Sequence, residues 1–323
     1  MVELEGRRTR RGGTTFLLVV AAVAFVLAGF VRLLGVDGTR HMVATTALTP
    51  YFAAGGVVLG VLALLLRRWG VAVLVLSLAA VLVAAVAPRA FPDSRPVGVG
   101  REVTVMASNF LVGKADAEVV VDLVRRYRVD VLAMQELTPA MVRDLDRAGL
   151  GLVLPHRHLL DEPGGSGSGI ASRYPVSARE LTAPGSLRQA GALVDLPGDD
   201  LEIVSVHPMP PVVEGGPETW QRDLAGLPER ELGGPVRVLA GDFNATLDHV
   251  ALRRLLNSGY VDAADQVGAG LTPTWPAGAL WPPPVTLDHV LVDGRCPVES
   301  FEVVDVPGSD HRAVISRFVV PAG

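Results

Sequence analysis

The chain has 323 residues, which is enough for one large domain or two smaller ones, and its charge is divided unevenly. Residues 1–100 carry ten arginines and four acidic residues, whereas residues 101–323 carry 19 basic and 30 acidic residues. The acidic C-terminal part weakens any case for tight, non-specific nucleic-acid binding through a broad basic face, and a single cysteine, Cys296, excludes an intrachain disulfide.

Three apolar runs occupy most of the chain between residues 16 and 88, at 16–36, 43–66 and 71–88. A membrane-spanning helix needs roughly 20 predominantly apolar residues, and a cleaved signal peptide would account for the first run only. We therefore expect three transmembrane helices that hold the chain in a lipid bilayer. No charged residue interrupts the second or third run, which favours an anchor over a transport pathway.

Arginines beside these runs predict the orientation of the chain in the membrane. Four arginines lie within residues 7–11, and Arg67 and Arg68 separate the second run from the third. By the positive-inside rule, residues 1–15 are cytoplasmic and the chain after residue 88 is extracytoplasmic, although Arg89 and Arg95 argue against this. The proline-rich residues 89–100 are typical of a linker, and a second domain is expected over 101–323.

The first half of that domain alternates short strands with helices. A strand at 103–108 leads to Asn109, a helix is expected over 115–127, and a strand at 129–134 leads to Glu136. Thr138 and Pro139 favour the start of a helix over 138–148. Because ligands gather at the strand ends of such sheets, Asn109 and Glu136 are candidates for one site.

The middle of the domain is dominated by turns and short strands. A loop rich in glycine and serine at 161–169 precedes an expected edge strand at 170–176, which Pro175 ends. Strands at 190–196 and 201–206 form a predicted hairpin that ends at His207. A weak helix is expected over 220–232.

The last third repeats the pattern of an apolar strand that ends in polar residues. The run that begins at Val236 ends in Gly241, Asp242 and Asn244. A helix is expected over 250–256, and a strand over 286–292 carries Asp288. Strands at 301–306 and 313–320 then flank a loop with Asp310 and His311.

Eight polar residues therefore lie at or near strand ends. They are Asn109, Glu136, His207, Asp242, Asn244, Asp288, Asp310 and His311. Carboxylate and amide oxygens are the ligands that Mg²⁺ prefers, so Glu136, Asp310 and Asn109 could hold such an ion. Hydrolysis of a phosphate ester also needs an oriented water and positive stabilisation of the phosphoryl oxygens. Asp242 could orient the water. His311, His207 and Asn244, together with the metal, could stabilise the phosphate, and Asp288 could fix the tautomer of the histidine.

At these residues the sequence resembles the endonuclease/exonuclease/phosphatase superfamily, which has the deoxyribonuclease I-like fold. The resemblance covers residues 103–318. It is carried by Asn109 and by six short motifs: Val-Leu-Ala-Met-Gln-Glu136, Gly169-Ile-Ala-Ser-Arg-Tyr-Pro, Ser205-Val-His-Pro, Gly241-Asp-Phe-Asn, Leu287-Asp-His-Val-Leu and Gly308-Ser-Asp-His. Each motif is weak alone, and together in this order they are specific.

The resemblance implies a four-layer α/β sandwich of two packed mixed sheets and hydrolysis of a phosphoester with Mg²⁺ or Mn²⁺. It implies that Glu136 is the metal ligand, with Asn109 and Asp310 in support. It further implies the roles of the catalytic residues. Asp242 and Asn244 would orient water and phosphate, Asp288 and His311 would form a dyad, and His207 would contact the phosphate.

Structural roles compete with these assignments. Asn109 could be a turn residue, Glu136 could cap the following helix, and Asp242 with Asn244 could form a plain Asx turn. Asp248 with His249 is expected to be a helix N-cap beside an exposed neighbour. His289, on the strand face opposite Asp288, is expected to be structural, and Trp275 is expected to be a wall of the cleft or part of the core.

The sequence thus favours a membrane-anchored, metal-dependent phosphodiesterase without an obligate protein partner. A phospholipid head group or another membrane-proximal phosphodiester is the favoured substrate, because a nuclease is expected to line its cleft with arginine and lysine. The expected domain is acidic and has one lysine, Lys114. Extracytoplasmic cleavage of nucleic acid, a non-catalytic binding domain and a small transporter are the alternatives.

Overall fold

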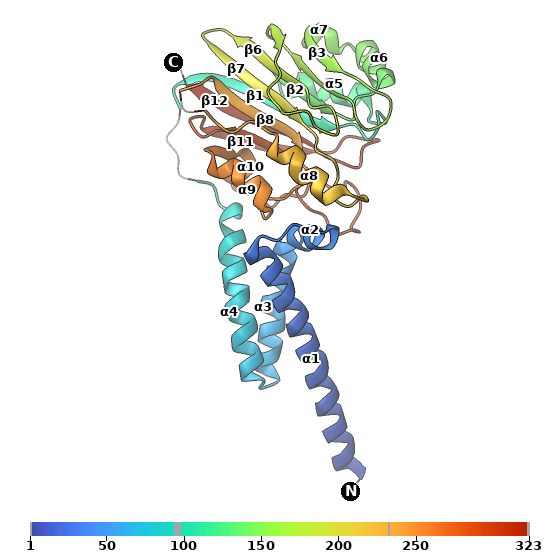
Figure 1. The fold of residues 1–323 in the computed structure, drawn as a ribbon, viewed down its shortest axis with the longest axis vertical. Coiled ribbons are helices and arrows are strands. Elements are labelled where there is room, and N and C mark those ends of the chain that lie inside the picture. Colours follow the sequence, from blue (N-terminus) through green and yellow to red (C-terminus); the bar gives the residue numbers. More distant parts are fainter. Residues whose placement is uncertain (1, 94–97, 232, 322–323) are drawn as a thin grey trace. The chain divides into compact units, whose positions relative to one another are not determined.

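The computed structural model describes residues 2–93, 98–231 and 233–321. The chain divides into two compact units, Met1–Pro88 and Arg89–Gly323. The N-terminal unit is helical and the C-terminal unit contains all the strands, as the colours of Figure 1 make plain. Each unit is described by itself below.

Four helices form the N-terminal unit: α1 (Val2–Leu34), α2 (Arg40–Ala47), α3 (Thr49–Leu65) and α4 (Trp69–Val86). Among the described residues, two segments are long and apolar enough to cross a membrane, Gly13–Leu34 and Trp69–Ala90. The third candidate is α2 with α3, which are bent by 67°. The prediction of three continuous spanning helices is therefore corrected to two, or three only if the bent pair counts as one.

The bend in the second apolar run has a local cause. Pro50 lies in the first turn of α3, where its missing N–H is tolerated, but it cannot continue a preceding helix. The break falls at Leu48, which ends α2 and precedes α3. Helix α2 has its own start, because the Thr39 side chain accepts a hydrogen bond from Met42 N. The second apolar run is long enough for one spanning helix but forms two helices.

Two six-stranded sheets form the centre of the C-terminal unit. The strand order of the first is β11-β12-β1-β2-β4-β3, and that of the second is β5-β6-β7-β8-β10-β9. The strands of the first are β1 (Gly100–Asn109), β2 (Val131–Gln135), β3 (His156–Leu160), β4 (Ser168–Ser172), β11 (Val298–Val304) and β12 (Ala313–Pro321). Those of the second are β5 (Val176–Ala178), β6 (Gly191–Leu196), β7 (Asp199–Val206), β8 (Val236–Asp242), β9 (Tyr260–Asp262) and β10 (Asp288–Asp293).

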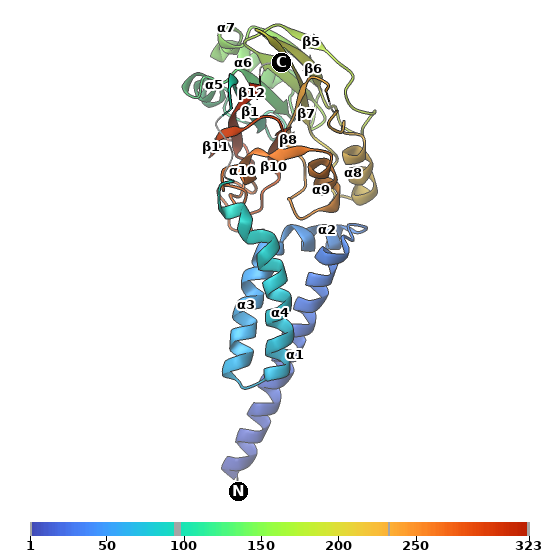
Figure 2. The same cartoon turned by 90° about the vertical axis from the view of Figure 1, so that its left-hand side faces the viewer.

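Both sheets are mixed, because each combines one parallel pair, β1 with β2 or β7 with β8, with antiparallel neighbours. Their facing sides share one apolar core, which includes Val105 and Val131 from the first sheet and Ile203 and Val238 from the second. Helices cover the outer faces: α5 (Ala117–Arg126), α6 (Pro139–Ala148) and α7 (Leu150–Val153) on one side, and α8 (Gly216–Ala225) and α9 (Val250–Asn257) on the other (Figures 1 and 2). The short helix α10 (Ala263–Gln266) contacts β10 and β11, and its Ala263 and Ala264 belong to the core between the sheets. This is the predicted four-layer α/β sandwich.

Several helix ends in this unit follow from capping residues. Thr138 accepts a hydrogen bond from Met141 N and Pro139 occupies the first turn of α6, as predicted. Asp116 caps α5 through hydrogen bonds from the N–H groups of Glu118 and Val119. These caps hold α5 and α6 over the first sheet, where their apolar faces join a second core with β1, β2 and β12.

Several element predictions in this unit differ from the structure, and the strand expected at 301–306 is β11 at Val298–Val304. The expected edge strand at 170–176 is instead β4, which lies inside the first sheet between β2 and β3, and the chain then crosses to edge strand β5 after Pro175. The expected helix at 220–232 begins at Gly216 and ends at Ala225, because Pro217 starts the helix early and its apolar face is short. The strand expected at 286–292 begins only at Asp288.

The expected linker at 89–100 is partly attached to the C-terminal unit, and residues 94–97 of it lie outside the described residues. Arg89 forms two hydrogen bonds of 2.9 Å with the buried carboxylate of Asp248. Its carbonyl accepts a hydrogen bond from Gly270 N, and Asp93 N donates to Gln266 O. The folded unit therefore includes residues 89–93.

Candidate active site

The eight polar residues of the sequence pattern come from neighbouring strand ends in both sheets. In the first sheet β1 ends at Asn109, whose register partner on β2 is Gln135, the residue before Glu136. In the second sheet Asp242 of β8 is directly opposite Asp288 of β10. The side-chain amide Nδ2 of Asn109 lies 3.2 Å from Asp242 Oδ2, so the two strand-end clusters meet in one site.

Glu136 and Asn109 form the part of the site contributed by the first sheet. Asn109 Nδ2 donates to Glu136 Oε1 at 3.1 Å, and Val112 N donates to the other carboxylate oxygen at 2.7 Å. Glu136 therefore does not cap α6, which Thr138 does instead. The amide oxygen of Asn109 accepts from Leu111 N at 3.0 Å. Asn109 thus makes a turn-type hydrogen bond and also holds two carboxylates in place.

Asp242 and Asn244 lie in the tight turn after β8. Asp242 Oδ1 accepts the Asn244 backbone N–H at 2.8 Å, which is the Asx turn considered above, while Oδ2 remains directed into the site. Asn244 has a positive φ of 49°, and its side-chain Nδ2 donates to Pro208 O. Gly241 is required at its position, because a Cβ there would lie 2.2 Å from Val206 O.

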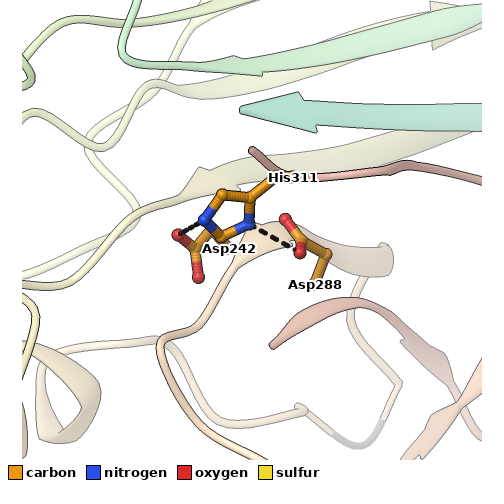
Figure 3. Close-up of side chains that lie close together, drawn as sticks. All are labelled: Asp242, Asp288 and His311. Atoms are coloured by element: carbon orange, nitrogen blue, oxygen red, sulfur yellow. Dashed lines mark hydrogen bonds and ion pairs between the residues drawn. The ribbon is translucent and has the colours of Figure 1, made fainter. Parts of the chain in front are cut away.

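Asp288 and His311 form a hydrogen-bonded pair (Figure 3). The distance from His311 Nδ1 to Asp288 Oδ2 is 2.8 Å, and the distance from Nε2 to Asp242 Oδ2 is 3.6 Å. Burial by itself would lower the pKa of His311, but the charges of Asp288 and Asp242 outweigh it and raise the pKa to about 10. The ring is therefore an imidazolium between two carboxylates.

The remaining histidine of the pattern, His207, lies against the same carboxylates and is 2% exposed. Its Nε2 is 3.8 Å from Glu136 Oε1 and 3.9 Å from Asp242 Oδ2. Burial lowers the pKa of His207, with the charge of Asp242 opposing the shift. A neutral His207 beside a charged His311 gives the site two imidazoles in different protonation states.

Burial also raises the pKa of Asp242, and the neighbouring Asp288 acts in the same direction while His311 opposes it. The carboxylate is 2% exposed and faces two histidines and the Asn109 amide. A carboxylate held in such a desolvated position is suited to accept a proton from a nucleophilic water or to orient it.

Asp310 adjoins this cluster through Trp275. Trp275 Nε1 donates to Asp310 Oδ2 at 3.1 Å, and the Trp275 ring lies 6.4 Å from the His311 ring. The other oxygen, Asp310 Oδ1, is buried and has no hydrogen-bond partner within the described ranges. The same holds for His207 Nδ1. Buried polar atoms are normally paired, so Asp310 Oδ1 and His207 Nδ1 are each able to form one further hydrogen bond or ligand contact.

Two donor sets could receive a cation. Asp242, Asp288 and His311 place one ligand atom each within 4.8 Å of one another, although Nδ1 of His311 is already hydrogen-bonded to Asp288 Oδ2. Glu136 and Asp310 supply carboxylate oxygens of the kind that Mg²⁺ and Mn²⁺ prefer. Glu136 shares the Asn109 amide with Asp242, and the assignment of Glu136, Asn109 and Asp310 as metal ligands stays a prediction.

Asp248 and His249 differ from their predicted role as a cap beside an exposed neighbour. Both are buried, each 1% exposed. His249 lies at the N-cap of α9 without a side-chain capping hydrogen bond, and its Nδ1 accepts from Thr246 N. The error arose because the partner of Asp248, Arg89, lies 159 residues earlier in the chain. His289 is buried and lies 2.8 Å from Asp262 Oδ2, on the face of the strand opposite Asp288.

Further contacts of the site were not apparent in the sequence. Gln189 Oε1 accepts the His207 backbone N–H, and the buried carboxylate of Asp223 accepts hydrogen bonds from Ser186 N and Met209 N. The side chains of Gln189 and Asp223 therefore connect loops that follow different strands. No spacing or periodicity signals these contacts, because loop-to-loop contacts depend on the whole fold.

A cavity of about 780 Å³ is lined by residues between His158 and Gly191, and none of the eight candidate site residues is among them. Its polar lining includes Glu162, Ser166, Arg188 and Gln189. Gln189 connects it to His207, and a Cβ at Gly165, in the glycine-rich loop before β4, would lie 3.5 Å from Glu136 Oε2.

The chain matches one protein family and is similar to several solved structures. A model of the Endonuclease/Exonuclease/phosphatase family matches residues 108–311. No curated protein sequence matches the chain. Among solved structures, an endonuclease/exonuclease/phosphatase from Beutenbergia cavernae is similar at 20% identity and a TM-score of 0.56, with 68% of this chain and 72% of that chain covered. Humanized D. rerio TDP2 is similar at 18% identity and a TM-score of 0.53, with 68% and 99% covered. A D. rerio TDP2 complex with a single-strand DNA product is similar at 16% identity and a TM-score of 0.51, with 68% and 99% covered.

Proposed function

Because this chain belongs to the endonuclease/exonuclease/phosphatase family, whose members are phosphoesterases and nucleases, we propose that it is a membrane-anchored hydrolase of a phosphodiester that depends on Mg²⁺ or Mn²⁺. One observation carries the proposal. Asn109, Asp242, His311 and Asp288 form a continuous chain of polar contacts that joins the ends of both sheets, with Glu136 attached to Asn109. A purely structural role would not require so many buried charges at one strand edge.

In this proposal each group has a distinct task. Asp242 orients the attacking water and accepts its proton. The His311 imidazolium, fixed by Asp288, stabilises the phosphoryl oxygens together with Asn244 and His207. Glu136, supported by Asp310 and Asn109, would hold the cation. When bound, the cation would supply further positive charge to the phosphoryl group.

The favoured substrate is a phospholipid head group or another membrane-proximal phosphodiester. Two segments of the N-terminal unit are apolar enough to span a bilayer, which would keep the catalytic unit close to a lipid surface. Nucleic acid is the alternative, since a TDP2 structure with a single-strand DNA product has a similar fold. The acidic C-terminal unit, with one lysine, favours the lipid.

The test is turnover by the full chain in detergent micelles. An activated nitrophenyl phosphodiester would report chemistry, and a panel of phospholipids, DNA and RNA would report substrate class. We expect turnover that needs Mg²⁺ or Mn²⁺ and falls by about 10³-fold or more in Asp242→Ala and Glu136→Ala. Asp122→Ala, at an exposed position of α5, is the matched control. A wild-type chain inactive with every metal and substrate would support a non-catalytic binding domain instead.

The orientation in the membrane is a separate part of the proposal. Positive charge before the first apolar segment and at Arg67 and Arg68 favours a cytoplasmic N-terminus, and an extracytoplasmic catalytic unit follows if the bent pair α2–α3 spans the bilayer. Reporter fusions after residue 38 and after residue 97 measure this directly. A cytoplasmic signal at residue 97 would reverse the localisation.

A further inference from the structure

A second buried pair of aspartate and histidine lies on the other face of β10. Asp288 and His289 are adjacent in that strand, so their side chains point to opposite faces of the sheet. Asp288 faces His311, whereas His289 faces Asp262, and both members of this second pair are at most 3% exposed. The second pair is therefore separated from solvent and from the proposed substrate.

The contacts of His289 determine its protonation. Nδ1 lies 2.8 Å from Asp262 Oδ2, and Nε2 lies 2.9 Å from the carbonyl oxygen of Ala245. A carbonyl oxygen only accepts, and the carboxylate of Asp262 is the acceptor opposite Nδ1, so each ring nitrogen donates a hydrogen. The other oxygen of Asp262 accepts Asp265 N at 2.8 Å and caps α10. The His289 imidazolium is thus held at Nδ1 by Asp262, which also caps α10, and at Nε2 by the carbonyl of Ala245.

The carbonyl that His289 holds belongs to the turn of the proposed active site. Ala245 follows Asn244, the residue with a positive φ, and precedes Thr246. The Phe243 ring on the other side of Asn244 packs edge-on against the His289 ring at 5.6 Å. His289 therefore contacts both neighbours of Asn244. A non-glycine residue with positive φ is a strained conformation that persists only where surrounding contacts enforce it.

We propose that His289, held by Asp262, is a positioning residue that keeps the Asn244 turn in its left-handed conformation and so keeps the Asn244 amide in the active site. The catalytic part of this proposal rests on the proposed function. The hydrogen bond that matters is the one from Nε2 to the Ala245 carbonyl, because the bond to Asp262 only orients the ring.

Two substitutions separate these two hydrogen bonds. In His289→Gln the amide nitrogen can reach the position of Nε2 and donate to Ala245 O. In His289→Asn the shorter amide can reach only the position of Nδ1 and the Asp262 carboxylate. Both variants remove the same buried positive charge, and each keeps one of the two hydrogen bonds of the ring. His289→Gln keeps the contact with the turn and loses that with Asp262, whereas His289→Asn keeps the contact with Asp262 and loses that with the turn.

The experiment compares these variants in the full chain in detergent micelles. We expect His289→Asn to lower kcat by about 100-fold, the scale of a small misplacement of a catalytic group, with KM little changed. His289→Gln should lower kcat by less than about tenfold, the size of one weakened hydrogen bond. Hydrogen exchange followed by mass spectrometry should reveal faster exchange of residues 241–249 in His289→Asn than in His289→Gln.

The exchange measurement does not depend on turnover. If the wild-type chain hydrolyses no phosphodiester, the proposed function fails, while the difference in exchange still decides whether His289 holds the turn. Equal exchange of residues 241–249 in the two variants, or equal kcat at equal thermal stability, would overturn the positioning role.

Discussion

Each face of strand β10 has a buried pair of one aspartate and one histidine, and the two pairs have different roles. On one face His311 donates to Asp288 through Nδ1, and its Nε2 lies 3.6 Å from the Asp242 carboxylate, beyond an ordinary hydrogen bond. On the other face both ring nitrogens of His289 are within 2.9 Å of acceptors. His311 therefore keeps one N–H group available for a ligand, whereas both N–H groups of His289 are already hydrogen-bonded.

This difference separates a chemical role from a structural one better than residue type or burial does. His311 and His289 are both buried imidazolium groups, at 7% and 1% exposure. For His289, burial would lower the pKa, but the hydrogen bond and charge of Asp262 outweigh it and raise the pKa, as the partner carboxylates do for His311. The two histidines differ in how many of their ring N–H groups donate a hydrogen bond. Substitutions on the two faces should therefore change different properties.

The largest effect on turnover is expected for Asp288→Asn. The amide keeps the shape of the side chain but removes the charge that holds His311 as an imidazolium. Loss of an orienting carboxylate beside a catalytic histidine lowers kcat by about 10³- to 10⁴-fold in comparable sites. Steady-state kinetics on an activated phosphodiester measure this, with turnover assayed well below the unfolding midpoint of the variant. A kcat within tenfold of wild type would contradict the role of the dyad.

On the opposite face, Asp262→Asn should mainly lower stability. The buried His289 imidazolium would lose its counter-charge, and breaking one partner of a buried pair destabilises by about 3–5 kcal/mol. Urea unfolding of the full chain in micelles measures the change, with turnover assayed well below the unfolding midpoint. There, the variant should retain far more activity than Asp288→Asn. Equal loss of activity in both variants would remove the distinction between the two faces.

A smaller effect is expected from pH in the presence of a chelator. The pKa of His311 is raised in the folded state from 6.5 to about 10. Its contribution to stability is therefore fully present below about pH 6.5 and is lost as pH rises through about 10. Unfolding midpoints from pH 6 to 10 should fall for wild type more steeply than for His311→Asn. The difference between the two chains removes the contribution of Cys296, whose pKa burial raises to about 12. Parallel curves would show that His311 is not the titrating group.

The smallest effect is expected at the surface of α6. Arg147 pairs with Asp144 one turn away, but its side chain is 79% exposed. Exposed pairs of this kind contribute about 0.5 kcal/mol or less. Arg147→Ala should therefore leave both the urea midpoint and kcat within error of wild type, which sets the baseline for the larger changes above.

The fold and the positions of the polar residues were predictable because the signals are local. An apolar strand that ends in Asp242 or Glu136 is visible in a short window, and Thr138 with Pro139 marks a helix start. Their order along the chain then specified the four-layer arrangement through the family resemblance. Strand β4 was misplaced as an edge strand because neither its length nor its glycine content distinguishes an inner strand from an outer one.

Contacts between distant parts of the chain were not predictable. The partner of Asp248 lies at Arg89, and the partner of His289 lies at Asp262, 27 residues away on a different strand. Asp262 precedes Ala263, Ala264 and Asp265, a sequence compatible with a helix cap, but nothing in it indicates a histidine partner. The break at Pro50 was visible in the sequence and was outweighed by the length of the apolar run.

The ion pair between Arg89 and Asp248 determines where the chain can be cut for expression. A soluble fragment that begins at residue 97, the obvious choice from composition, would lack the guanidinium that donates to a carboxylate with a fully buried side chain. It would also lack the backbone contacts of Arg89 and Asp93 with Gly270 and Gln266. A fragment that begins at residue 89 keeps all of them. Poor yield from the shorter fragment would therefore reflect a truncated domain rather than a requirement for the membrane.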